Sequence, residues 1–142
     1  MKFEFLVPGP PRGKGRPRFT KTGMAYTDDK TAAYENLVRL AFQAESQGAP
    51  PLTGPVSLSI IAYMPIPSSL SDKRKRAMVG KPHTKKSDAD NIAKAVNDGL
   101  NGVAYADDSQ IWMLIVRKVY SETPRLEVTI EETEGADHAA NP

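Results

Sequence analysis

Apolar runs with the period of a β-strand occur four times in this chain, and they limit what it can fold into. In residues 2–7 and 126–130 apolar and polar residues alternate, which predicts strands with one buried and one solvated face. Apolar residues predominate in 56–64 and occupy both parities of 111–120, so we expect the last of these strands to be covered on both faces. The four runs together predict one sheet.

Helical spacing marks the segments between these strands. Apolar residues three and four apart predict helices over 28–47 and 89–100, and a serine cap predicts a short basic helix over 71–80. The order strand, helix, strand, helix, helix, strand, strand predicts an α/β (α+β) fold, a single domain in which helices pack on a mixed β-sheet. We expect this domain to span residues 1–131, and the small, polar residues 132–142 to form a disordered tail.

Composition excludes several classes of protein. The chain has no cysteine, which excludes a disulfide scaffold, a thiol nucleophile and a Cys-ligated metal. No apolar run approaches the roughly 20 residues of a membrane span. The N-terminus has no basic segment followed by an apolar one, so we expect no signal peptide, no membrane partner and a cytoplasmic location. The two histidines, His83 and His138, are too few for a zinc site of the usual kind, and we expect both on the surface.

Basic residues are unevenly distributed. Residues 1–100 carry 16 basic and 9 acidic side chains, whereas residues 101–142 carry 3 and 8. Two basic segments predict contact with a polyanion such as DNA, although solvated loop charge would explain the same composition. The candidate DNA contacts are Arg12, Lys14, Arg16, Arg18, Lys73, Arg74, Lys85 and Lys86.

Carboxylates gather around the start of the predicted helix 89–100. Asp90 and Lys94 lie four residues apart and project from one face of the helix, and Asp88 stands at its start. A second acidic pair, Asp107-Asp108, precedes a predicted strand. Mg²⁺ and Mn²⁺ are hard cations that prefer carboxylate oxygens, so this pattern predicts a metal site for phosphate chemistry with a lysine at its rim.

Each of these residues also has a purely structural interpretation. Asp88 could be a helix cap, Asp90 and Lys94 an exposed ion pair, and Asp107-Asp108 a turn before a strand. The metal hypothesis requires more than those interpretations do. It requires carboxylates from distant stretches of chain to share one ion-sized pocket.

Three motifs follow one another in the second half of the chain: Lys86-Ser87-Asp88-Ala89-Asp90-Asn91-Ile92-Ala93-Lys94, Asp98-Gly99-Leu100-Asn101-Gly102 and Asp107-Asp108-Ser109-Gln110-Ile111. They resemble the signature of the RusA family of phage-derived Holliday junction resolvases. The opening from Pro8 to Arg18, with Tyr26-Thr27, is similar to the Gly/Lys-rich branch of that family, and the resemblance covers about residues 1–131.

The resemblance implies a homodimeric, Mg²⁺- or Mn²⁺-dependent crossover junction endodeoxyribonuclease without an organic cofactor. Such an enzyme makes paired symmetrical nicks in four-way DNA junctions. Ser87 departs from the pattern, since many relatives have proline there. By position, the resemblance implies metal-binding roles for Asp88, Asp90 and Asp108, an accessory role for Asp107, a supporting role for Asn91 and an essential catalytic role for Lys94. The alternatives are a nuclease for flaps or other branched DNA, and a non-catalytic DNA-binding accessory protein.

Overall fold

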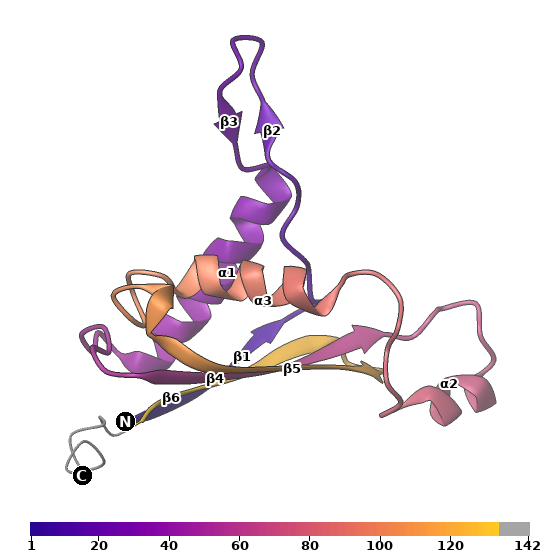
Figure 1. The fold of residues 1–142 in the computed structure, drawn as a ribbon. Coiled ribbons are helices and arrows are strands. Elements are labelled where there is room, and N and C mark those ends of the chain that lie inside the picture. The colour runs from indigo at the N-terminus through magenta and orange to yellow at the C-terminus, as the bar shows by residue number, and fades with distance from the viewer. Residues whose placement is uncertain (134–142) are drawn as a thin grey trace.

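Four strands form one mixed sheet in a computed structural model that describes residues 1–133 (Figure 1). Across the sheet the order is β1 (Lys2–Pro8), β6 (Arg125–Glu132), β4 (Val56–Pro65) and β5 (Ile111–Ser121). The pairs β1–β6 and β6–β4 are antiparallel, and β4–β5 is parallel. The predicted fold class, a mixed sheet with helices packed on it, is confirmed.

Two long helices cover one face of this sheet, α1 (Asp29–Ser46) and α3 (Ala89–Leu100) (Figure 1). The short helix α2 (Asp72–Met78) stands beyond one end of the sheet, away from α1. A small hairpin of β2 (Arg18–Phe19) and β3 (Ala25–Tyr26) projects from the start of α1, away from the sheet. The long helices lie close to their predicted ranges, because their apolar residues fall on one face.

The core lies between the sheet and the two long helices. Helix α3 can approach α1 closely because Gly99 carries no side chain: a Cβ there would lie 2.7 Å from the Glu35 carbonyl oxygen and 3.1 Å from the Val38 Cβ. The Arg39 Nε donates a 3.1 Å hydrogen bond to the Gly99 carbonyl at the same crossing. The largest fully buried side chains include Phe42, Leu58, Ile60, Ile92, Leu100, Tyr105, Leu126 and Ile130.

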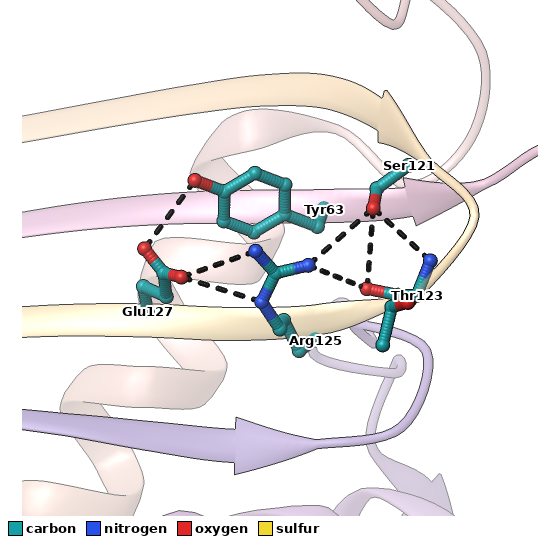
Figure 2. A network of polar contacts seen from close by, with 5 residues as sticks. All are labelled: Tyr63, Ser121, Thr123, Arg125 and Glu127. Carbon is teal, nitrogen blue, oxygen red and sulfur yellow. Dashed lines mark hydrogen bonds and ion pairs between the residues drawn. The ribbon is translucent and has the colours of Figure 1, made fainter. Parts of the chain in front are cut away.

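The opposite face of the sheet carries polar side chains, among them the network in Figure 2. The Arg125 guanidinium lies 3.8 Å from the centroid of the Tyr63 ring, and the Tyr63 hydroxyl donates to Glu127 Oε1 at 3.3 Å. Arg125 also donates a 2.8 Å bond to the Thr123 carbonyl, and Ser121 Oγ accepts from the Thr123 amide at 3.0 Å. These contacts fix the turn between β5 and β6. They lie on the face of the sheet away from the helices, and a solvated face of this kind is typical of antiparallel strands.

The prediction that the strand at 111–120 is covered on both faces is wrong. Strand β5 lies at the edge of the sheet with β4 as its only strand neighbour there, and four consecutive apolar side chains, Trp112 to Ile115, are 41–60% exposed. The second half of this edge is closed, because the His83 amide donates to the Lys118 carbonyl and the Gly80 amide to the Tyr120 carbonyl, both at 2.9 Å. The uncovered part of the edge is therefore apolar.

Two further predictions concern single segments. His83 is buried rather than on the surface, with its ring centroid 4.8 Å from that of Tyr120, and burial followed by the charge of Lys118 lowers its pKa. Glu132 is the last residue of β6, one residue beyond the predicted end of the domain. The rest of the predicted tail, with His138, lies outside the described residues apart from Thr133. Within residues 1–133, the helices are too short or too polar to span a membrane.

Candidate metal and DNA-binding site

Lys118 of β5 binds the backbone of the loop before α3. The Lys118 Nζ donates to the carbonyl oxygens of Lys85 at 2.7 Å and of Ser87 at 2.6 Å. This cation therefore fixes the backbone immediately before Asp88. Lys118 was not among the predicted site residues, although a charged pair, Arg117-Lys118, within a largely apolar strand is a usable signal of a polar partner.

Asp88 and Asp90 stand at the N-terminus of α3 with their carboxylates unengaged. Asp88 has the extended backbone of an N-cap, yet its side chain accepts no capping hydrogen bond. Asp90 and Lys94 are both exposed, and no ion pair joins them within the described residues. The structural interpretations of a helix cap and an exposed ion pair therefore do not describe these side chains. Their oxygens are available to a ligand.

Asp107 and Asp108 have different surroundings although they are adjacent. The Asp107 carboxylate accepts from the Ser109 amide at 3.0 Å, and its own amide donates to Gln110 Oε1 at 2.9 Å, which closes a capping box on the short turn η1 (Asp108–Gln110). The hydrogen bonds from Ser109 lower the pKa of Asp107. Asp107 is thus engaged in local structure, as the turn interpretation predicts, whereas the exposed Asp108 carboxylate has no such bond within residues 1–133.

Asp108 lies near the opposite end of α3 from Asp88. The chain leaves α3 through a tight turn in which the Ala104 amide donates to the Leu100 carbonyl at 2.9 Å. The Tyr105 hydroxyl then donates to Asn97 Oδ1 at 3.1 Å. Burial raises the pKa of the Tyr105 phenol, and the negative charges of Asp108 and Asp98 raise it further. These contacts associate Asp108 with the last turns of the helix.

The lengths of two elements, α3 and β5, indicate how far apart Asp88 and Asp108 lie. Helix α3 has 12 residues, which corresponds to about 18 Å at 1.5 Å per residue. Along β5, the seven residue steps from Ile111 to Lys118 correspond to about 23 Å. Within residues 1–133 no three Asp, Glu or His side chains lie close enough to hold one ion. The expectation that Asp88, Asp90 and Asp108 converge within one chain is therefore wrong.

The glycine-rich loop of residues 13–16 lies against the start of α3. A Cβ on Gly13 would lie 2.9 Å from the Ser87 Cβ and 3.0 Å from the Asn91 Cβ, so this approach requires glycine. The Gly13 amide donates to Ser87 Oγ at 3.3 Å and the Lys14 amide to the Asn91 carbonyl at 2.9 Å. Ser87 thus anchors the loop. The two segments line a cavity of about 380 Å³ that includes Asp88.

Lys14 bridges the two long helices. Its Nζ lies 2.6 Å from Glu35 Oε2 on α1 and 2.8 Å from Asp98 Oδ2 on α3, and its side chain is only 20% exposed. Burial alone would lower the pKa of this ammonium, but the hydrogen bonds and charges of Asp98 and Glu35 outweigh it and raise the pKa above 10.5. Two carboxylates therefore neutralise a charge that the sequence analysis assigned to DNA.

The other candidate DNA contacts are exposed, but they do not form one cluster. Arg16 and Lys86 line the cavity beside Asp88. Lys73 and Arg74 lie on α2, beyond one end of the sheet (Figure 1). The remaining residues of the set are Arg12 in the N-terminal loop, Arg18 in β2 and Lys85 before α3.

The donor atoms fit a hard divalent cation in kind but not in number. Asp88 and Asp90 offer unengaged carboxylate oxygens, which are the ligands that Mg²⁺ and Mn²⁺ prefer. A third carboxylate, that of Asp108, is beyond their reach in the same chain. Within residues 1–133, the candidate carboxylates of one chain therefore lie at opposite ends of α3.

Comparison with known proteins points to one family. Residues 8–131 match the family model described as "Endodeoxyribonuclease RusA". A protein of Bacillus subtilis (strain 168), described as "Uncharacterized protein YqaN", is 39% identical over 139 residues, which cover 92% of this chain and 96% of the relative. The range 8–131 includes the glycine-rich loop and the aspartates Asp88, Asp90, Asp107 and Asp108.

The Lys14 bridge makes a prediction about stability. Lys14→Met leaves Glu35 and Asp98 without a cation, and we expect the free energy of unfolding to fall by about 1–2 kcal/mol. This is less than for a fully buried pair, because Asp98 is 36% exposed. The raised pKa of Lys14 means that its contribution is complete below about pH 10.5 and is lost at higher pH. Urea denaturation of both proteins from pH 7 to 11.5 measures this difference.

Arg16→Met is the matched control, because Arg16 belongs to the same loop but has no ion pair in the described part of the chain. We expect a change within about 0.5 kcal/mol. An equal loss in both variants, or a Lys14 contribution that grows as the pH rises above 10.5, would contradict the assignment.

Proposed function

The chain belongs to the RusA family of endodeoxyribonucleases, and from this membership we propose that it resolves four-way (Holliday) DNA junctions by paired, Mg²⁺- or Mn²⁺-dependent phosphodiester hydrolysis. The observation that carries the proposal is the pair of unengaged carboxylates at the N-terminus of α3, Asp88 and Asp90, beside a basic, glycine-rich loop. Carboxylates without a protein partner next to phosphate-binding cations suit metal-assisted phosphate chemistry.

In this proposal the residues at the start of α3 divide the work. Asp88 and Asp90 hold the metal, which when bound polarises a phosphoryl oxygen and lowers the pKa of water. Lys94, exposed four residues after Asp90, places an ammonium group where negative charge develops on the phosphate. Arg16 and Lys86 contact neighbouring phosphates, which positions the strand without reading its sequence.

We propose that a second copy of the chain completes the metal site with its Asp108. The exposed apolar side chains of residues 112–115 lie on an unpaired sheet edge, which is a surface that proteins commonly cover. If two β5 strands pack antiparallel about a two-fold axis there, the start of each strand faces the end of the other. Asp108 precedes the start of β5, and Lys118 at its end holds the loop before Asp88.

The same two-fold axis accounts for paired cleavage. A symmetric dimer has two equivalent sites at a fixed separation, and a four-way junction offers two equivalent scissile phosphates. Selection of junctions would then depend on the shape of the branched DNA rather than on base sequence.

A cleavage assay on three DNA substrates tests the proposed activity. With Mg²⁺ we expect paired symmetrical cuts in a synthetic four-way junction, little cutting of a flap or a linear duplex, and no cutting of any of them with a chelator. Equal cutting of flaps would instead indicate a general nuclease for branched DNA. Junction binding without cutting under every metal condition would indicate a non-catalytic accessory protein.

The adjacent aspartates provide a matched pair of variants. Asp107→Asn keeps an oxygen that can accept the capping hydrogen bond, so we expect cleavage close to that of the wild type. Asp108→Asn should reduce the cleavage rate by about 10²-fold or more, and so should Asp90→Asn and Lys94→Ala, with junction affinity retained. Single-turnover cleavage and anisotropy binding assays measure the two properties. Loss of cleavage in Asp107→Asn alone would reverse the assignment of the pair.

Mixing two inactive variants tests whether the site spans two subunits. A heterodimer of Asp90→Asn and Asp108→Asn chains contains one site with both defects and one site with neither. After the two variants are unfolded and refolded together, we therefore expect nicking of single strands to return, without paired cuts. If each site were built within one chain, every site would carry one defect, and the mixture would stay inactive.

A further inference from the structure

We infer that the β2–β3 hairpin is a stacking element that inserts between unstacked bases at the branch point of the DNA substrate. The inference rests on the proposed function, because it requires DNA to be the substrate. It adds a recognition surface that the metal site does not use. Four properties of the hairpin suit it to this role: its fixed turn, its exposed rings, its charge and its distance from Asp88.

The hairpin is short but has a defined turn. Arg18 pairs with Tyr26, and Phe19 pairs with Ala25. The Thr20 amide donates to the Met24 carbonyl at 2.8 Å, and Gly23, with φ of 87°, closes the turn. A two-stranded hairpin is only marginally stable by itself, so this shape depends on how its base is held.

The base of the hairpin is anchored to the start of α1. Asp28 caps the helix, accepting from the Thr31 amide and hydroxyl at 2.9 Å each, and these bonds lower its pKa. Thr31 Oγ1 in turn accepts from the Gly15 amide at 3.1 Å. A Cβ on Gly15 would collide with both Asp28 and Thr31, so only glycine allows the chain to pass here. The projection in Figure 1 therefore starts from a fixed point.

Beyond this base the hairpin exposes large apolar side chains. Phe19 is 67% exposed, Met24 69% and Tyr26 48%. Because neighbouring residues of a strand point to opposite faces, the pairing places Phe19 on one face and Tyr26 on the other. The hairpin thus presents one aromatic ring on each side, an arrangement that suits insertion between two bases.

Charge identifies the partner as a polyanion. Residues 5–27 contain no acidic side chain, whereas Arg16, Arg18 and Lys21 are exposed along the hairpin. Exposed aromatic rings on a cationic hairpin fit a stack of bases with flanking phosphates better than they fit another protein surface. Aromatic rings stack on any base, so the interaction does not require a particular sequence.

Unstacked bases are the part of DNA where an aromatic ring can insert at the lowest cost in free energy. Inserting a ring into continuous duplex requires base stacking to be broken first, whereas bases at a branch point have already lost part of their stacking. The hairpin should therefore contribute to binding of junctions and little to binding of linear duplex. Its cationic residues should contribute to both.

The hairpin lies within reach of the proposed metal site. Arg16 lines the cavity that contains Asp88, and Phe19 follows three residues later. Three extended residues span at most about 10 Å, which is about three base steps at 3.4 Å each. A ring inserted at the branch point is therefore compatible with a phosphate held beside Asp88 close to that point.

Equilibrium binding in chelator, where no cleavage occurs, tests the inference. We expect Phe19→Ala and Tyr26→Ala each to weaken binding to a four-way junction by on the order of tenfold, with affinity for linear duplex unchanged. Phe19→Trp should retain the wild-type affinity because it retains a ring. Leu40→Ala, which removes a 54% exposed apolar side chain from α1, is the matched control and should change neither affinity.

Two further measurements separate stacking from other causes. Ring removal should leave the slope of log affinity against log salt unchanged, whereas Arg16→Gln with Arg18→Gln should lower it by about one unit per lost phosphate contact. Permanganate reactivity of thymines at the branch point should rise when the wild type binds and not when Phe19→Ala/Tyr26→Ala binds.

Three results would overturn the inference: an equal loss of duplex and junction affinity, no loss of either, or conversion of a dimer to monomers in sedimentation by the hairpin variants. The last would make the hairpin a contact between subunits. A wild type that neither prefers nor cuts junctions would instead refute the proposed function. The wild-type and variant measurements therefore distinguish the two failures.

Discussion

The ion pairs of Lys14 with Glu35 and Asp98 are the interaction on which the rest of this site depends. One ammonium group joins the N-terminal loop to both long helices, and it does so where Gly99 lets α1 and α3 touch. The loop is thereby pressed against the start of α3, with the Lys14 amide bonded to Asn91 and the Gly13 amide to Ser87. Arg16 and the β2–β3 hairpin follow Lys14 directly in the chain, so this attachment fixes the point from which they start.

Two pairs of neighbouring acids show how surroundings decide the role of a carboxylate. The Asp107 carboxylate accepts a hydrogen bond from Ser109 in the turn before β5, and hydrogen bonding to Ser109 lowers the pKa of Asp107. Asp88 occupies a capping position without making the capping bond, and it lies two residues from another unengaged carboxylate, Asp90. Two close negative charges without a cation repel one another, and a divalent ion relieves that repulsion. The exposed carboxylates of Asp88 and Asp90 are therefore available to a cation.

Much of the architecture could be predicted from sequence because it depends on local periodicity. Apolar residues at periods of 2 and 3.6 predict the ranges of β1, β4, α1 and α3, because such a period is visible within the short stretch of sequence that forms each element. The edge position of β5 could not, since apolar residues at both parities arise equally in a central strand and in a strand that meets another molecule. The separation of Asp88 from Asp108 could not be predicted either. The two residues lie near opposite ends of a 12-residue helix, and no sequence pattern shows where the chain runs after that helix. The ion pairs of Lys14 could not be predicted, because its partners Glu35 and Asp98 are 21 and 84 residues away in the sequence.

The two anomalies of β5 have a single explanation in the proposed dimer. An unpaired apolar edge at residues 112–115 would be costly to leave in water, and a metal site divided between the ends of α3 would be incomplete in a monomer. In the proposed dimer, contact between two β5 edges would bury the apolar edge and complete the metal site. If the ion binds only where carboxylates of both subunits meet, its binding free energy adds to that of association, so the metal and the dimer stabilise each other. Cleavage by an isolated subunit is then prevented by the same geometry that pairs the two cuts.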